Sequence, residues 1–221
     1  MRFIKKAFHI YVECKSKKKS SEIWYFQCLS RNLSNITFVY YHNKNQFFTN
    51  ARKNKDEKVF FVAILDVDLD YNNLNLSINA RKEVIDQFLK KDIEVYLSSR
   101  CWENWLVNHF EEFNVFTSNG TKIPIPNYEK KREWYTTNYQ ILNESLPLAV
   151  RRSHELRSKQ YDNQLIDFDT GTLPSYDDNK IVLLIIEHFN PISYVDLFIS
   201  KLFYENGTPI EFSSEISSQR L

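Results

Sequence analysis

An apolar run that ends in alternating aspartates dominates the hydrophobic and polar pattern of this chain. Residues 59–65 are all apolar and rich in β-branched and aromatic side chains, which indicates a strand buried on both faces. Asp66, Asp68 and Asp70 follow at alternate positions. Because alternate residues of a strand point to the same side, we expect Asp66 and Asp68 to leave one face of the sheet together.

The first half of the chain alternates between strand-like and helix-like segments. The pattern predicts strands over residues 8–14, 36–40, 59–65 and 92–99, helices over 22–31, 77–89 and 100–110, and a short helix from about Thr49. This order favours an α/β fold with a mainly parallel central sheet flanked by helices.

The second half of the chain is mostly helical by the same criteria. The pattern predicts helices over residues 129–142, 146–159 and 192–204, whereas residues 181–186 fit a buried strand or a buried helix equally well. We therefore divide the chain into a core of residues 1–115 and a helical C-terminal extension of residues 116–221. The extension is expected to pack on the core and could face a partner.

Carboxylates also follow the other predicted strands. Glu13 closes the first strand, and Glu103 lies just beyond the fourth. The carboxyl ends of parallel strands meet at one edge of a sheet, where open α/β folds place their active sites. Crowded carboxylates repel one another unless a cation holds them, and Mg²⁺ or Mn²⁺ prefers oxygen ligands. The pattern therefore predicts a metal site for phosphoryl transfer, with a further carboxylate as general acid or base.

A simpler interpretation of the same residues stays open. The aspartates after the third strand are equally suited to capping the next turn or helix. Asp70 fits a turn, or an outer position around the site, better than a ligand position. In this interpretation Glu13 is a surface strand end, and Glu103 is an exposed helix residue or an ion-pair partner.

Composition narrows the choice of function. The chain has only three glycines and no glycine-rich phosphate loop, so any ATP-driven step needs a second chain. Its three cysteines lack a C-x-x-C pairing, which indicates free thiols in a reducing compartment. No apolar run approaches the roughly 18 residues of a membrane span, and the N-terminus lacks the apolar region of a signal peptide. We therefore expect a soluble, cytoplasmic protein without a membrane partner.

Charge is distributed unevenly along the chain, whose formal net charge is +1. Residues 1–160 hold 26 basic and 18 acidic side chains, whereas residues 161–221 hold 3 and 10. A basic body with an acidic end suits a nucleic-acid surface on the body. Lys15, close to Glu13 in the sequence, is a candidate phosphate contact. Unevenly distributed solvated charge is the alternative explanation.

Four segments of the sequence resemble the RloB-like family, whose members carry a Toprim-type nuclease domain. Residues 12–26 resemble the family's first strand, its glutamate and the following helix start, and residues 64–68 resemble its Asp-x-Asp strand. Residues 98–110 are the most specific match, and a weaker match over residues 190–197 extends the resemblance to most of residues 8–204. The residues in register within the most specific match are Glu103, Trp105, His109 and Phe110.

The resemblance implies a Toprim-like catalytic core and a nuclease that depends on Mg²⁺ or Mn²⁺. Such proteins act in prokaryotic defence against phage, in abortive-infection systems, and are encoded with an RloA-like ABC-type ATPase. The substrate is RNA, tRNA included, or DNA, with RNA favoured by analogy, and the oligomeric state stays open, a homo-oligomer included. The roles implied here are Glu13 as general acid or base, Asp66 and Asp68 with Glu13 as metal ligands, Glu103 as a further catalytic residue, and Glu22 and His109 as supporting residues.

The sequence also departs from the family pattern. Cys14 stands where the family has a glycine after the first glutamate, so this loop approaches phosphate less closely. Ser99 and Arg100 replace an Asn-Pro pair, and Arg100 is a second candidate phosphate contact. His109, in a helix of tryptophan and phenylalanine, fits a buried hydrogen-bonding role better than a nucleophilic one. Two alternatives stay open: a Toprim-like module that binds nucleic acid or the ATPase without cutting, and a phosphotransfer domain for a small molecule.

Overall fold

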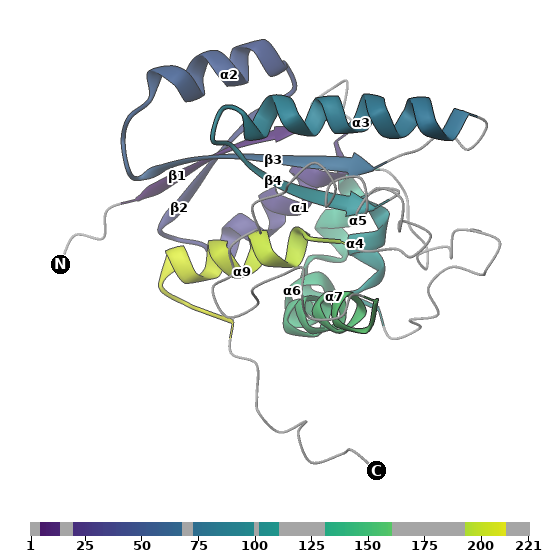
Figure 1. Ribbon diagram of the computed structural model, residues 1–221. Coiled ribbons are helices and arrows are strands. Elements are labelled where there is room, and N and C mark those ends of the chain that lie inside the picture. Colours follow the sequence, from purple (N-terminus) through teal and green to yellow (C-terminus); the bar gives the residue numbers. More distant parts are fainter. Residues whose placement is uncertain are drawn as a thin grey trace.

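Four parallel strands lie at the centre of the molecule, in the order β2-β1-β3-β4 (Figure 1). The computed structural model describes residues 5–13, 20–67, 73–99, 102–110, 131–160 and 193–210. Helices flank the sheet on both faces, which confirms the predicted α/β class and fits a Toprim-like fold. The strands are β1 (Lys6–Val12), β2 (Ile36–Tyr41), β3 (Val59–Val67) and β4 (Glu94–Ser99).

Helices account for most of the other described residues. Within the described part of the chain, none of them has both the length and the apolar character needed to span a membrane. The ambiguous residues 181–186 lie outside that part. The first helical elements are α1 (Ser21–Leu29), the 3₁₀ turn η2 (Ser30–Asn32), α2 (Lys44–Lys53) and α3 (Leu74–Leu89). The later ones are α4 (Glu103–Val107), α5 (Arg132–Thr137), α6 (Tyr139–Glu144), α7 (Leu146–Gln160) and α9 (Val195–Asn206).

Two helices begin earlier than the sequence pattern predicts. Asn43 caps α2, because its side-chain oxygen accepts a hydrogen bond from the backbone N–H of Gln46 at 3.0 Å. The helix therefore starts well before Thr49. α3 likewise starts at Leu74, ahead of the predicted start at Ser77.

The helix predicted over residues 129–142 is divided into α5 and α6 at Asn138. The Asn138 side-chain amide donates a hydrogen bond to the Trp134 carbonyl at 2.8 Å, and its backbone N–H donates to the same carbonyl at 2.9 Å. Asparagine side chains compete for backbone groups in this way, which makes helix ends favourable at such residues. The break lets α5 pack on α1 and α6 pack on α7.

Aromatic side chains on opposite faces of β1 join the sheet to its two helical layers. Tyr11 packs against Phe47 of α2 and Phe88 of α3, at ring-centroid distances of 5.7 and 5.1 Å. Phe8, on the other face, packs against Phe198 of α9 at 5.9 Å. The sheet is therefore covered by α2 and α3 on one face and by α1 and α9 on the other (Figure 1).

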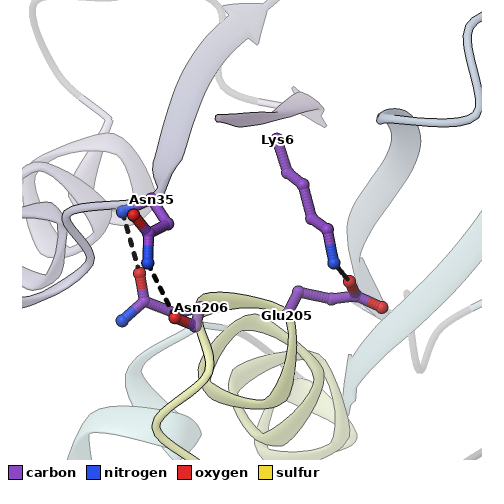
Figure 2. Close-up of polar contacts among 4 residues, drawn as sticks. All are labelled: Lys6, Asn35, Glu205 and Asn206. Carbon is purple, nitrogen blue, oxygen red and sulfur yellow. Dashed lines mark hydrogen bonds and ion pairs between the residues drawn. The ribbon is translucent and has the colours of Figure 1, made fainter. Parts of the chain in front are cut away.

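The C-terminal end of α9 forms an ion pair and hydrogen bonds with residues at the N-terminal ends of β1 and β2 (Figure 2). Glu205 forms an ion pair with Lys6 of β1. The side-chain oxygen of Asn206 accepts a hydrogen bond from the backbone N–H of Asn35, and its carbonyl accepts one from the Asn35 side chain, both at 3.0 Å. Gly207 ends the helix in the left-handed conformation, at a φ of 84°. This part of the extension therefore packs directly on the sheet, whereas a domain boundary near residue 115 stays a prediction.

Candidate active site

The carboxyl ends of β1, β3 and β4 lie side by side at one edge of the sheet, which we call the carboxyl edge. Val12, the last residue of β1, is paired with Ile64 of β3, and Asp66 of β3 is paired with Ser98 of β4. Glu13 directly follows β1. The backbone therefore brings Glu13 and Asp66 to the ends of neighbouring strands, where open parallel sheets bind their ligands.

The Glu13 carboxylate is paired with Arg81 of α3. The Arg81 guanidinium donates a hydrogen bond from Nη1 to Oε2 of Glu13 at 2.6 Å, and the two side chains are 17% and 29% exposed, respectively. The pKa of the nearby Tyr11 phenol is raised by burial and further by the Glu13 charge, while the Arg81 charge acts in the opposite direction. Glu13 is therefore held on the face of the sheet that carries α2 and α3.

Asp66 belongs to the opposite face of the sheet. Alternation along β3 groups Asp66 with Ile64 and Phe60. Phe60 stacks on Phe8 at 4.6 Å, on the face covered by α9. The two carboxylates thus reach the carboxyl edge from different faces, so a cation shared by both has to lie at the edge itself, beyond the strand ends.

Arg81 is a candidate site residue that the sequence reasoning missed. It lies on the same face of α3 as Ile78 and Ile85, which are both buried in the core. A charged residue on the apolar face of a helix indicates a half-buried ion pair, because an unpaired buried charge is costly. The pattern does not identify the partner, since Glu13 lies 68 residues away along the chain.

The other predicted site residues fall partly outside the described residues. Glu22 lies in the first turn of α1 and accepts a hydrogen bond from the Ser20 hydroxyl at 2.9 Å, and Ser20 itself caps the helix. Glu103 is the first residue of α4, but its side chain is not among the described ones. The predicted site residues that lie wholly outside are Lys15, Asp68, Asp70 and Arg100.

Glu13 and Asp66 are the described residues at the carboxyl edge that could hold a divalent metal. Carboxylate oxygens are the donors that Mg²⁺ and Mn²⁺ prefer, and the Arg81 guanidinium contacts one of the two oxygens of Glu13. Among the described residues, no group of three or more histidine, cysteine, aspartate or glutamate side chains could hold a metal. The predicted third ligand, Asp68, is not one of them. The residues present therefore fit the part of the predicted site that the structure describes.

Comparison with protein families adds to this geometry. The family model described as RloB-like protein matches residues 10–202 of the chain. This chain belongs to the RloB-like family. The match includes the carboxyl edge, α3 and most of α9, and it confirms the resemblance carried by the sequence motifs. No curated protein and no solved structure matches the chain.

His109 of this RloB-like protein is enclosed in the core. Its exposed fraction is 3%, and its ring nitrogens lie 3.1 Å from the Tyr25 hydroxyl and 2.9 Å from the Ser145 hydroxyl. The Ser145 hydroxyl donates to the Ile141 carbonyl at 2.6 Å, so it accepts from Nδ1 of His109, while Nε2 accepts from Tyr25. A neutral His109 therefore links α1 and the α6–α7 junction to the turn after α4 by buried hydrogen bonds, and its supporting role at the site stays a prediction.

Acidification is expected to destabilise the fold through His109. Burial lowers the pKa of His109 from 6.5 to about 3. The unfolded chain takes up a proton as the pH falls below 6.5, whereas the folded protein does not until about pH 3, so the stabilising contribution is complete above pH 6.5 and is lost below it. This group should lower the free energy of unfolding by about 1.4 kcal/mol per pH unit across that window.

Urea unfolding at neutral pH and at about pH 5 measures this effect in the native protein and in His109→Gln. The variant should be less stable at neutral pH but should lose less stability on acidification, because it lacks the titrating ring. Equal losses in the two proteins would show that other groups cause the acid sensitivity.

The start of α9 brings the C-terminal extension to the carboxyl edge. The backbone N–H of Tyr194 donates to the Leu97 carbonyl at 2.8 Å, and Ser193 forms an isolated antiparallel bridge with Ser98. Ser153 of α7 donates to the Ser193 carbonyl at 2.8 Å. The described part of the weaker family motif therefore lies next to the end of β4.

Proposed function

We propose that this RloB-like protein is a metal-dependent nuclease that hydrolyses phosphodiester bonds in nucleic acid. The observation that carries the proposal is the position of Glu13 and Asp66 at the ends of neighbouring parallel strands, in a chain of this family. Two carboxylates at this edge supply oxygen ligands and a proton acceptor at the place where a parallel sheet accommodates a substrate.

The proposed reaction assigns the candidate residues to metal binding, acid–base catalysis and phosphate contact. Asp66, together with Asp68, holds Mg²⁺ or Mn²⁺, and Glu13 is a further ligand or accepts the proton of the attacking water. Glu103, at the start of α4, is the second candidate for the acid–base step. When bound, the metal neutralises phosphate charge and makes water a better nucleophile. The proposed phosphate contacts are Lys15 and Arg100.

The proposed substrate is RNA, tRNA included, or DNA, and the proposed setting is defence against phage in the cytoplasm. Family membership and the excess of basic over acidic side chains in residues 1–160 support this choice. The sequence has no glycine-rich phosphate loop. The proposed partner is the one that the resemblance to the RloB-like family implies, an RloA-like ABC-type ATPase that would supply ATP hydrolysis.

Cleavage of total cellular RNA and plasmid DNA by the purified protein, with Mg²⁺, Mn²⁺ or EDTA, tests this proposal. We expect cutting that requires metal and is lost in Asp66→Asn, because an amide is a weaker metal ligand than a carboxylate. Asp92→Asn is the matched control, since it makes the same change at an exposed aspartate just before β4, at the opposite edge of the sheet.

Equal cutting in EDTA, or cutting by Asp66→Asn at the native rate, would contradict the proposed function. The assay is repeated with the ATPase present, because activation by this partner is part of the proposal. Activity that appears only with the ATPase and still depends on Asp66 would support it.

The Arg81–Glu13 ion pair favours a second candidate function, a Toprim-like module that binds nucleic acid or the ATPase without cutting. A carboxylate neutralised by an internal guanidinium is less available to a metal than one that faces only water. Cys14, where the family has a glycine, also favours this second function, because the loop approaches phosphate less closely. Retained RNA binding without cleavage in any metal, even with the ATPase present, would favour this function over the nuclease.

A further inference from the structure

The contact between Arg81 and Glu13 sets a condition on any cation that approaches the carboxyl edge. Nη1 of Arg81 lies 2.6 Å from Oε2 of Glu13, which is the distance of a charge-assisted hydrogen bond. Both side chains are shielded in part from water, so the pair is screened less than one on the open surface. A divalent cation that binds the same carboxylate has to compete with this guanidinium.

Packing around Arg81 limits the movements that could break its ion pair with Glu13. Its neighbours on the same face of α3, Ile78 and Ile85, are buried in the core. Phe88, further along the helix, packs on Tyr11 of β1 at 5.1 Å. The helix is therefore held on the sheet, so the ion pair is broken by rotation of the two side chains and not by movement of α3.

The ion pair also affects where the Glu13 carboxylate lies. Arg81 comes from the helix layer on one face of the sheet, whereas alternation along β3 places Asp66 on the other face. As long as the ion pair persists, Glu13 is kept on the side away from Asp66. Its release would allow both carboxylates to approach one cation at the edge.

We propose that Arg81 is a latch that holds Glu13 against α3, so that a divalent metal engages Glu13 only in competition with the Arg81 guanidinium. This inference rests on the proposed function, because it takes metal binding at Glu13 as its starting point. Arg81 acts through Glu13 and is therefore a positioning residue. Its presence lowers the affinity of the site for metal, which is the opposite of the effect of a residue that only supports the fold.

Binding of Mn²⁺, measured by electron paramagnetic resonance or calorimetry, tests the latch in four proteins. These are the native protein, Arg81→Gln, Glu13→Gln and the double variant. We expect Arg81→Gln to bind Mn²⁺ about tenfold more tightly, because the competing charge-assisted hydrogen bond is lost. This gain in Mn²⁺ affinity should be absent in the Glu13→Gln background, because the carboxylate for which Arg81 and the metal compete is then missing.

Three further variants serve as controls for this measurement. Lys90→Gln removes an exposed positive charge directly after α3 and should leave the Mn²⁺ affinity unchanged. Arg81→Lys keeps a cation next to Glu13 and should restore most of the native affinity. Arg81→Met replaces Arg81→Gln if that variant does not fold, because an unbranched apolar side chain suits a position between Ile78 and Ile85.

The outcomes that overturn the latch differ from those that overturn the nuclease. If Glu13→Gln weakens Mn²⁺ binding but Arg81→Gln leaves it unchanged or weakens it, only the latch fails and the metal site stands. If the gain persists in the Glu13→Gln background, Arg81 acts by its general charge and the latch again fails alone. If neither the native protein nor Arg81→Gln binds Mn²⁺, the latch fails together with the metal site proposed above.

Discussion

Replacement of Glu13 by glutamine is expected to reduce metal-dependent cleavage by at least about 100-fold, the effect typical of losing a general acid or base. The change removes a negative charge and a proton acceptor at the end of β1 but keeps the shape of the side chain. The glutamine carbonyl can still accept the hydrogen bond that Arg81 donates at 2.6 Å in the native protein. The loss should therefore concern activity and leave the fold intact.

Initial cleavage rates and thermal unfolding of the same preparation separate these two effects. The stability of Glu13→Gln should stay within about 1 kcal/mol of the native value, because the ion pair it weakens is partly solvated. Glu57→Gln makes the same change at an exposed glutamate just before β3, at the opposite edge, and should keep full activity. Cleavage by Glu13→Gln at the native rate would remove Glu13 from the proposed site.

Phe198→Ala is expected to lower the free energy of unfolding by about 3–5 kcal/mol. Phe198 of α9 is 0% exposed and packs against Phe8 at 5.9 Å and Tyr96 at 5.2 Å. It also contacts Phe26 of α1 at 5.5 Å. Alanine leaves a cavity between α1, α9 and the sheet, which closely packed surroundings fill only in part. A loss of this size is a large share of the stability of a typical domain.

Urea unfolding measures this loss, with Tyr204→Ala as the control. Tyr204 lies on the same helix but is 72% exposed, so its removal should change stability by no more than about 0.5 kcal/mol. Similar small effects of both substitutions would show that α9 is a separable attachment and that the sheet does not depend on it.

Elements governed by local chemistry were predicted well from the sequence. The apolar run of β3 is buried on both faces, as at Val62, Ala63 and Leu65, because strands on either side and helices above and below cover it. α1 begins within one residue of its predicted start, and its cap is Ser20, whose side chain accepts a hydrogen bond from the Ile23 N–H at 3.3 Å. Apolar patterns and caps depend on neighbouring residues, so they can be recognised without the fold.

Elements with weak local signals were predicted less well. α2 has a polar sequence in which only Phe47 is buried, so its apolar face is too narrow to show the helix in the sequence pattern. The break at Asn138 depends on a single side chain within an otherwise helical segment. Tertiary packing decides the structure of α2, and one asparagine side chain decides the break at residue 138. Helix propensity averaged over a stretch of sequence predicts neither.

Alternation and strand endings are local properties of the chain, so the parallel α/β fold and the positions of Glu13 and Asp66 at strand ends could be predicted from the residues alone. The pairing of Glu13 with Arg81 and the position of Asp66 on the opposite face of the sheet could be seen only in the folded protein. Such contacts depend on strand order and on how α3 packs across the sheet. That packing brings together residues 68 positions apart, which no local pattern records.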